Sequence, residues 1–371
     1  MNFDFSDDLH QLRDQARRYL AERCTPKHVR RVLDGEKPYD GALWLGMAEM
    51  GWLGAAIPEE FGGAGIGHEG LCVLAEELGR VLAPVPFSSS VCMATEAILL
   101  AGSPAQKRSY LPGFAAGMHI GTLAWAEGPG NPRAGAFSAR LSGGKLAGTK
   151  WPVLDGGSAD LAVVTAQDES GAPILALADL RASGVTRTAL ETVDPSRPQA
   201  KLVMDGVHAE RLGAPGDGPA LLEQLLDRSA VLLAFEQLGG ASACLEMATD
   251  FARERYAFGR PIGSFQAIKH KLADVYIANE LARSNAYYGA WALQTGAAEL
   301  KLAATSARVS AIDAFHLASK ESIQTHGGMG FTWEADCHLF YRRARLLALT
   351  IGSAAHWKNR LVDALEARNA A

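Results

Sequence analysis

Hydrophobic residues recur at helical spacing in the first third of the chain. Leu9, Leu12, Ala16 and Leu20 follow the three-to-four-residue period of one helix face. Further helical runs cover 70–82 and 91–100, and prolines at positions 84 and 86 end the first of them. The loop 59–67 between the early runs carries four glycines, which a helix would not tolerate. Residues 1–117 are therefore predicted to form an N-terminal α-helical domain.

The pattern changes near residue 119 to short apolar or alternating runs, separated by Gly, Asp, Ser and Pro. This spacing is typical of antiparallel strands, and Ser142-Gly143-Gly144-Lys145 predicts a tight hairpin between two of them. Residues 118–212 are predicted to be a middle antiparallel β domain.

From residue 219 the chain returns to long helical runs with few breakers, at 221–256, 265–295, 299–324 and 333–368. Four long helices in sequence predict a four-helix bundle, which makes residues 213–371 the C-terminal four-helix-bundle domain. The predicted fold class is therefore α+β.

A turn that glycine and proline impose separates the first of these helices from the second. Gly259, Pro261 and Gly263 end the first helix near Tyr256, and Ser264 is the predicted N-cap of the next. Arginines 253, 255 and 260 gather beside the new helix start, where backbone N–H groups favour an anion. A solvated basic turn between packed helices is the alternative.

Composition narrows the function classes. The 371 residues carry a net charge of −5 without basic blocks, which argues against nucleic acid as the main partner. No run approaches about 18 uninterrupted apolar residues, and the acidic N-terminus shows no export signal, so no membrane span is predicted. Five widely spaced cysteines form no C-x-x-C pair, which favours reduced thiols and a cytoplasmic location.

Three motifs identify a family resemblance. The stretches EEFGGAGIG at 59–67, RYAFGRPIGSFQAIKHKLAD at 255–274 and IQTHGGMGF at 323–331 occur in this order. With them the chain resembles the acyl-CoA dehydrogenase family of flavoproteins over nearly its whole length. The resemblance implies helical, β and four-helix-bundle parts, an oligomer, FAD at a subunit interface, an acyl-CoA substrate, and electron-transfer flavoprotein or a similar electron acceptor.

The resemblance also assigns FAD-binding positions. In the family, one subunit lends pyrophosphate contacts to its neighbour's FAD. The matching positions here are Arg255, Phe258, Gln266, Gln324, Gly327 and Gly328. An arginine meets a phosphate with two N–H groups, and paired glycines let backbone approach a dinucleotide closely.

The family's own flavin-holding loop and strand are altered. They match Ala126-Glu127-Gly128-Pro129 and Trp151-Pro152-Val153, so the tryptophan is kept while Ala126 and Val153 replace hydroxyl residues. Pro132 and Arg133 replace a small polar pair. Trp151, Ala126 and Val153 are nevertheless the predicted ring-contact positions, because backbone donors can compensate.

The chain departs most from the family pattern at the position of the catalytic base. Removing hydrogens across an acyl Cα–Cβ bond needs a carboxylate for the Cα proton. Ile351 stands where the family usually has its Glu, and Ser229 stands at the position that some members use instead. Glu236, on nearly the same helical face as Ser229, is the candidate base; a Glu that pairs with a neighbouring helix is the alternative. Asp227 and Arg228 are candidate substrate-binding residues.

His270 and His326 lack a Cys or carboxylate at ligand spacing, so structural roles are expected and no metal site is predicted. Three functions remain open. The chain is an FAD-dependent acyl-CoA dehydrogenase that forms a trans-2-enoyl-CoA; or it is a half-site subunit that completes a homologous partner's FAD site in an α2β2 tetramer; or it is a related flavoenzyme with another substrate and base.

Overall fold

The computed structural model describes residues 5–130 and 137–370. The chain packs as two compact units, each made of separated segments. Unit 1 comprises residues 1–29, 72–83 and 230–371, and unit 2 comprises 30–71 and 84–229. The domain boundaries predicted after residues 117 and 212 remain a prediction, because these units are a different division of the chain. Pro132 and Arg133 lie outside the described residues.

The helical run predicted from Leu9 to Leu20 is α1 (Asp7–Arg23) of unit 1, and the run at 70–82 is α4 (His68–Arg80), most of which also belongs to unit 1. The helix α2 (Pro26–Leu33) is divided between the two units. The other helices of the N-terminal part belong to unit 2: α3 (Gly41–Glu49), η1 (Trp52–Gly54), η2 (Glu59–Phe61), α5 (Phe87–Ser89), η3 (Ser90–Thr95), α6 (Glu96–Ala101) and α7 (Pro104–Ala115). The predicted helix over 91–100 is not uniform, because η3 is a π-helix whose six residues are all buried.

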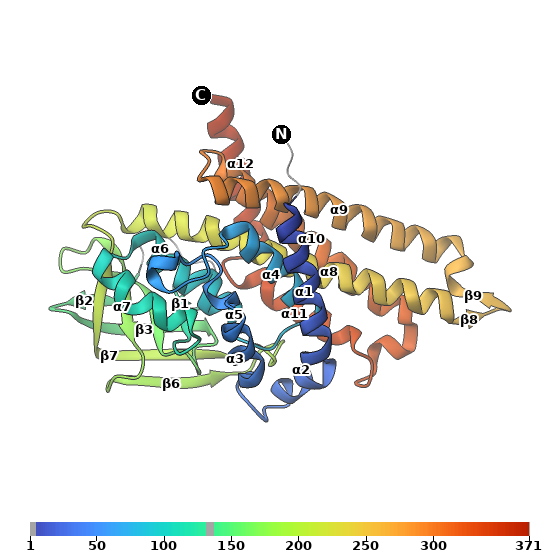
Figure 1. The fold of residues 1–371 in the computed structure, drawn as a ribbon, viewed down its shortest axis with the longest axis horizontal. Helices are drawn as coiled ribbons and strands as arrows, with labels where there is room; N and C mark the ends of the chain where they lie inside the picture. Colours follow the sequence, from blue (N-terminus) through green and yellow to red (C-terminus); the bar gives the residue numbers. More distant parts are fainter. Residues whose placement is uncertain (1–4, 131–136, 371) are drawn as a thin grey trace. The chain divides into compact units, whose positions relative to one another are not determined.

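A seven-stranded sheet forms the rest of unit 2 (Figure 1). Its strands are β1 (Gly121–Ala124), β2 (Arg140–Ser142), β3 (Lys145–Leu154), β4 (Leu161–Gln167), β5 (Pro173–Asp179), β6 (Val185–Leu190) and β7 (Gln199–Leu212). The hairpin at Ser142–Lys145 is confirmed: these two residues pair, and Gly143 and Gly144 have φ of 55° and 74°. The sheet is not wholly antiparallel, because β1 pairs with β4 in parallel.

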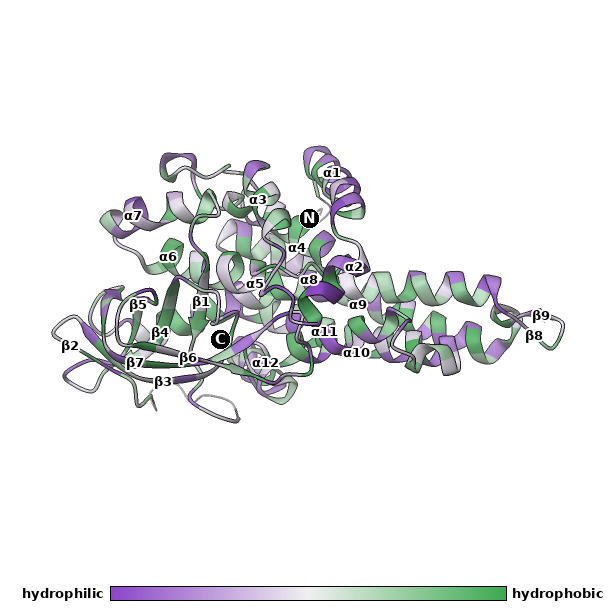
Figure 2. Cartoon of the chain, turned by 90° about the horizontal axis from the view of Figure 1, so that it is seen from below, coloured by the Kyte–Doolittle hydropathy of each residue, from purple (hydrophilic) through white to green (hydrophobic). Residues whose placement is uncertain are grey.

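Unit 1 holds α1 (Asp7–Arg23), most of α8 (Gly218–Glu254), α9 (Gln266–Thr295), α10 (Leu300–His326), α11 (Cys337–Leu349) and α12 (Ala354–Ala370). Figure 1 shows α9 and α10 running side by side, and Figure 2 shows polar and apolar residues alternating along both. The helix predicted over 333–368 is wrong as one element. It breaks between α11 and α12, where Gly352 adopts φ of 109°, a conformation that does not continue a helix.

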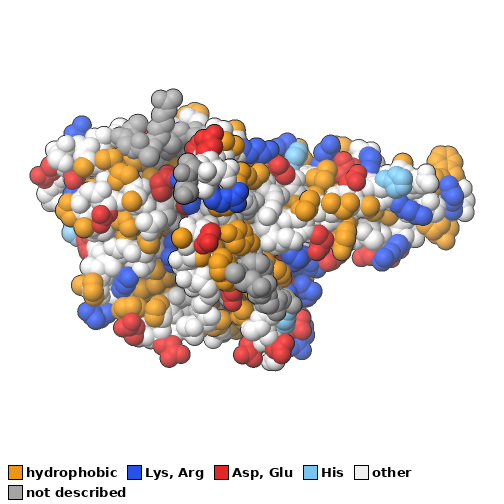
Figure 3. Space-filling view, turned by 90° about the horizontal axis from the view of Figure 1, so that it is seen from above, with side chains coloured by type: hydrophobic (Ala, Val, Ile, Leu, Met, Phe, Trp, Pro, Cys, Tyr) orange, Lys and Arg blue, Asp and Glu red, His pale blue; other side chains and the backbone are white. Residues whose placement is uncertain are grey.

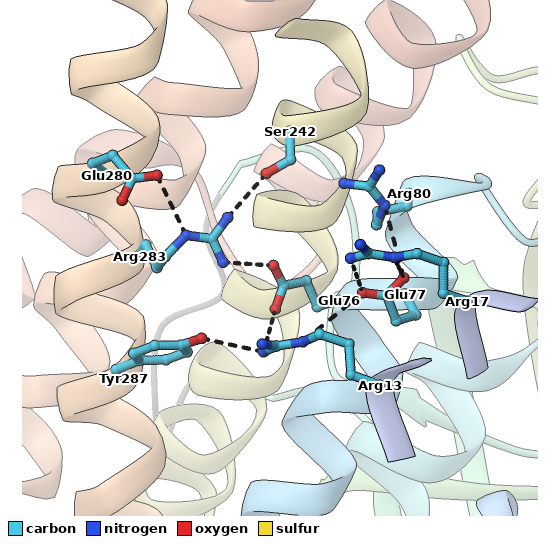
Figure 4. A network of polar contacts seen from close by, with 9 residues as sticks. All are labelled: Arg13, Arg17, Glu76, Glu77, Arg80, Ser242, Glu280, Arg283 and Tyr287. Carbon is cyan, nitrogen blue, oxygen red and sulfur yellow. Dashed lines mark hydrogen bonds and ion pairs between the residues drawn. The ribbon is translucent and has the colours of Figure 1, made fainter. Parts of the chain in front are cut away.

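Arginine–glutamate pairs fasten α1 to the other helices of unit 1 (Figure 4). Glu76 of α4 accepts from Arg13 at 3.2 Å and from Arg283 of α9 at 2.7 Å. Glu77 binds Arg17 with both oxygens, at 2.7 and 2.9 Å. Because Glu76 and Glu77 are almost fully buried, these pairs supply the polar contacts that their carboxylates need.

Within the described residues, α8 alone is long and apolar enough to cross a membrane by length and composition. However, 72% of its most apolar window is buried inside the protein, as in a core helix.

Candidate functional site

The turn after α8 is a small β-hairpin. Strands β8 (Tyr256–Ala257) and β9 (Arg260–Pro261) pair, followed by η4 (Ile262–Ser264) and α9. The first helix ends at Glu254 rather than near Tyr256, because the chain turns into β8. The N-cap of α9 is Phe265, not Ser264, since the extended residue before the helix is Phe265, with φ of −80° and ψ of 133°.

The hairpin presents its predicted FAD-binding residues outward. Phe258 is 96% exposed and adopts φ of 54°, a strained backbone conformation for a residue other than glycine. Arg255 and Gln266 are also exposed, and the Arg255 side chain forms no ion pair with any described residue. Figure 3 shows hydrophobic and basic side chains gathered at this end of the helices. The exposure of these groups leaves them available to a ligand or another chain.

The second predicted segment lies at the same end of unit 1. His326, the last residue of α10, stacks on Phe251 of α8 with ring centroids 4.3 Å apart. His326 Nδ1 also lies 2.7 Å from the Ser322 carbonyl, which supports the structural role expected of this histidine. The structure therefore brings the end of α8, which leads into Arg255, close to the end of α10, which carries Gln324.

The glycines after Gln324 leave room for a ligand. Gly327 has φ of 61°, and its N–H donates to the Gln324 carbonyl. A side chain built on Gly328 would meet no described atom within 4 Å. Three exposed apolar residues follow in and after η5 (Gly327–Phe331): Met329, Phe331 and Trp333, with 52%, 79% and 51% exposure.

The predicted flavin-ring positions lie in unit 2. The Trp151 N–H donates to the Ala126 carbonyl at 2.9 Å, so the strand and the loop do lie together. Ala126 is 6% exposed and Val153 is fully buried. Neither side chain carries a hydrogen-bonding group, and the buried Val153 belongs to the core rather than to an open surface.

Sequence reasoning missed a buried lysine beside this loop. Lys150 Nζ donates to Glu127 at 2.7 Å and to Thr165 at 2.9 Å. Burial lowers the pKa of Lys150 to about 8, against the opposing effect of Glu127. Glu127 also accepts from the Ser138 N–H and hydroxyl. The pair anchors the loop that carries Ala126; the only sequence signal was that both residues flank predicted positions.

Neither residue at the family's two base positions carries a proton-accepting carboxylate. Ile351 lies fully buried in the break after α11, and its carbonyl accepts from Trp357 Nε1 at 3.1 Å. Ser229 is equally buried, and its hydroxyl donates to the Cys92 carbonyl in the π-helix at 2.8 Å. Both positions serve packing and backbone contacts.

The candidate base Glu236 lies in a buried charged cluster of unit 1. It is 5% exposed, with Arg343 Nη1 3.5 Å from its carboxylate. The adjacent Gln237 accepts from Arg308 at 2.6 Å. Burial lowers the pKa of Arg308 to about 9, and the nearby Glu236 carboxylate opposes that shift. This arrangement supports the alternative that Glu236 pairs with neighbouring helices.

The candidate substrate residues lie at the unit 2 end of α8. Asp227 is 6% exposed. Arg228 Nε donates to Glu96 at 2.8 Å, and the same carboxylate lies 3.0 Å from His68 Nε2. No sequence motif marks Glu96 or His68, which lie 28 residues apart in the chain. The described residues contain no group of three or more His, Cys, Asp or Glu side chains arranged to hold a metal ion.

Comparisons with known proteins agree on one family. The family model "Acyl-CoA dehydrogenase, N-terminal domain" matches residues 6–118, and "Acyl-CoA dehydrogenase, C-terminal domain" matches 216–365. Acyl-CoA dehydrogenase IpdE2 of Mycobacterium tuberculosis (strain ATCC 25618 / H37Rv) is 32% identical over 91% of each chain.

Two solved structures are also similar over almost the entire chain. A variant of the Tcur3481-Tcur3483 steroid ACAD is 34% identical, with a TM-score of 0.89 over 98% of this chain and 99% of that one. The ChsE4-ChsE5 complex from Mycobacterium tuberculosis is 28% identical, with a TM-score of 0.89 over 99% of each chain.

Proposed function

Because this chain belongs to the acyl-CoA dehydrogenase family, whose members are FAD-dependent oxidoreductases, we propose that it is a subunit of an oligomeric acyl-CoA dehydrogenase. The assembly removes two hydrogens across the Cα–Cβ bond of an acyl-CoA and yields the trans-2-enoyl-CoA. Within it, this chain is the half-site subunit: it lends FAD contacts to a homologous partner, and the partner supplies the catalytic carboxylate.

One observation carries this proposal, namely the contrast between two sets of positions in the same chain. Arg255, Phe258 and Gln266, which the family lends to a neighbour's FAD, are present and exposed. Ile351 and Ser229, at the family's base positions, are buried and lack a carboxylate. A chain that only donates FAD contacts needs the exposed FAD-binding residues but needs no carboxylate at the base positions.

The exposed set fits the chemistry of FAD. Arg255 has no ion pair among described residues, so its guanidinium is free to meet the diphosphate with two charge-assisted hydrogen bonds. Phe258 would pack on an aromatic ring, and the open space at Gly328 would admit the dinucleotide close to backbone. FAD, when bound, supplies the acceptor for the β-hydride. This chain's part is to hold and orient it.

The alternative in which Glu236 acts as the base has weaker support. A general base must hold a lone pair toward the substrate's Cα proton. The Glu236 carboxylate is directed at Arg343 inside the core, with Arg308 close by. The Arg343 guanidinium therefore competes with a substrate proton for the lone pairs of this carboxylate.

The names of the similar structures support a heteromeric assembly and a steroid or other lipid substrate. One is named as a steroid ACAD with two components, Tcur3481 and Tcur3483, and the other as a complex of ChsE4 with ChsE5. We therefore propose a heteromeric partner, with α2β2 as the simplest closed arrangement, and an acyl group from steroid or other lipid catabolism. Electron-transfer flavoprotein or a similar protein is the proposed electron acceptor, and the cytoplasm the proposed location.

Flavin content tests the proposal. The chain is purified alone and after co-expression with a homologous acyl-CoA dehydrogenase chain from the same source, and flavin is quantified in each preparation. We expect the chain alone to be colourless and the co-purified complex to be yellow. A yellow, active single-chain preparation would instead favour the catalytic alternative.

A further inference from the structure

A buried carboxylate in unit 2 contacts an arginine and a histidine at its edge. Glu96 is fully buried, with one oxygen 2.8 Å from Arg228 Nε and the other 3.0 Å from His68 Nε2. The side chains of Arg228 and His68 keep 19% and 16% exposure, so they lie on the outer side of the carboxylate. The three residues begin or belong to three different helices, α4, α6 and α8.

The hydrogen bonds leave N–H groups of Arg228 unused. His68 Nε2 lies within 3.1 Å of both Glu96 oxygens, so its proton points at the carboxylate. That nitrogen therefore cannot also accept from Arg228 Nη2, although the two atoms are 3.1 Å apart. Arg228 Nη1 forms no hydrogen bond or ion pair with a described residue. Glu96 thus fixes the guanidinium through Nε and leaves both Nη atoms with N–H bonds to offer.

The surroundings favour a negative ligand. His68 is the first residue of α4, a 13-residue helix, and the N-terminal end of a helix carries partial positive charge. The hydroxyl of Thr95, which precedes Glu96, is buried without a hydrogen-bond partner among the described residues. Thr95 is the last residue of the π-helix η3, and π-helical turns are frequent at functional sites.

We propose that Arg228, oriented by Glu96 beside His68, forms a subsite for an oxyanion, either a carboxylate or a phosphate group. The inference rests on the proposed function for its ligand, because an acyl-CoA can supply both groups. Its phosphates belong to the CoA part, and a carboxylate is present when the acyl group is that of a dicarboxylic acid. An arginine held at its Nε presents two parallel N–H bonds that match either anion.

Direct binding to the purified complex tests the subsite without requiring turnover. Isothermal titration compares glutaryl-CoA, butyryl-CoA and free CoA on wild type and on Arg228→Gln. If the subsite takes an acyl carboxylate, the variant binds glutaryl-CoA about 10- to 100-fold more weakly and butyryl-CoA unchanged, the loss expected for charge-assisted hydrogen bonds. If it takes a CoA phosphate, all three ligands weaken by the same factor.

Two further variants keep the test decisive. Arg228→Lys retains the charge and the pairing with Glu96 but not the planar fork, so it should bind between wild type and Arg228→Gln. Arg181→Gln is the matched control, because Arg181 is a half-exposed arginine of the same unit whose ion pair among the described residues is with Asp179. The control should bind every ligand like wild type.

Free glutarate and inorganic phosphate are titrated as well. Their binding, if it depends on Arg228, supports the subsite even should the complex prove not to be a dehydrogenase. Equal affinities of wild type and Arg228→Gln for every ligand, including these two, would overturn the proposal.

Discussion

Arg343 Nη1 lies 3.5 Å from the carboxylate of Glu236, and both side chains are almost completely buried in unit 1. Arg308 is also buried, close enough for the Glu236 carboxylate to raise its pKa against the effect of burial. A buried charge that loses its partner is strongly destabilising. We therefore propose that Glu236 is needed for packing rather than for chemistry.

Glu236→Gln separates the two roles. The substitution keeps the shape but removes the charge that the buried Arg343 pairs with, so the free energy of unfolding should fall by about 3 kcal/mol. Dehydrogenase activity of the folded assembly should change less than about 10-fold. Chemical denaturation and steady-state kinetics measure the two effects.

The surface variant Asp313→Asn serves as the matched control for stability. Asp313 pairs with Lys358 at 3.2 Å, but both side chains are more than half exposed, so little loss is expected. A loss of activity on the order of 10⁴-fold in Glu236→Gln, with folding and flavin content intact, would identify Glu236 as the base after all.

Arg255→Ala should weaken FAD binding in the assembly that contains this chain. Losing a charge-assisted hydrogen bond to phosphate costs about 1.5–3 kcal/mol. Flavin retention during dialysis measures the effect. The matched control is Arg181→Ala, a half-exposed arginine of unit 2 paired with Asp179 at 3.2 Å. Equal flavin retention in Arg255→Ala and wild type would rule out the assigned contact.

Phe258→Asn should stabilise the chain while impairing its function. Phe258 and Gly259 both have positive φ, the conformation that an Asn-Gly turn adopts with least strain. Relief of the phenylalanine's backbone strain should raise the free energy of unfolding by about 1 kcal/mol. The same variant should lower the flavin content of the complex, because the exposed ring is lost. A variant that is less stable than wild type would contradict this account of the hairpin.

The sequence predicted those elements whose local chemistry determines them. The Gly143-Gly144 pair encodes the hairpin between β2 and β3, and the cluster of Gly259, Pro261 and Gly263 ends α8. In contrast, the break after α11 was missed, because the apolar spacing continues through Leu347 and Ile351 and only one glycine marks it.

The buried polar clusters around Glu96 and Glu236 could not be predicted from the sequence for a different reason. Glu96 meets His68 and Arg228 across 28 and 132 residues of chain, so no local spacing reveals the group. The pairing of Glu236 with Arg343 likewise depends on how α8 and α11 pack. Family motifs gave the FAD-binding positions, whereas their exposure came from the fold.

Low pH should reduce the stability of unit 2 because Glu96 becomes protonated. Burial alone would raise its pKa, but His68 and Arg228 outweigh burial and lower the pKa from 4.5 to about 2. The group therefore stabilises the fold fully above about pH 4.5, and this contribution, on the order of 3 kcal/mol, is lost as the pH falls toward 2. Denaturation of wild type and Glu96→Gln across this range tests the effect. The variant should show a flatter pH dependence; equal slopes would refute it.

Native mass spectrometry of the purified complex tests the central claim most directly. We predict a mixed assembly of this chain with a homologous chain, α2β2 in its simplest form, that holds fewer flavins than polypeptides. The exposed donor residues Arg255, Phe258 and Gln266 and the buried Ile351 and Ser229 both lead to this expectation. A homotetramer of this chain alone, with one FAD per polypeptide and turnover of an acyl-CoA, would contradict it.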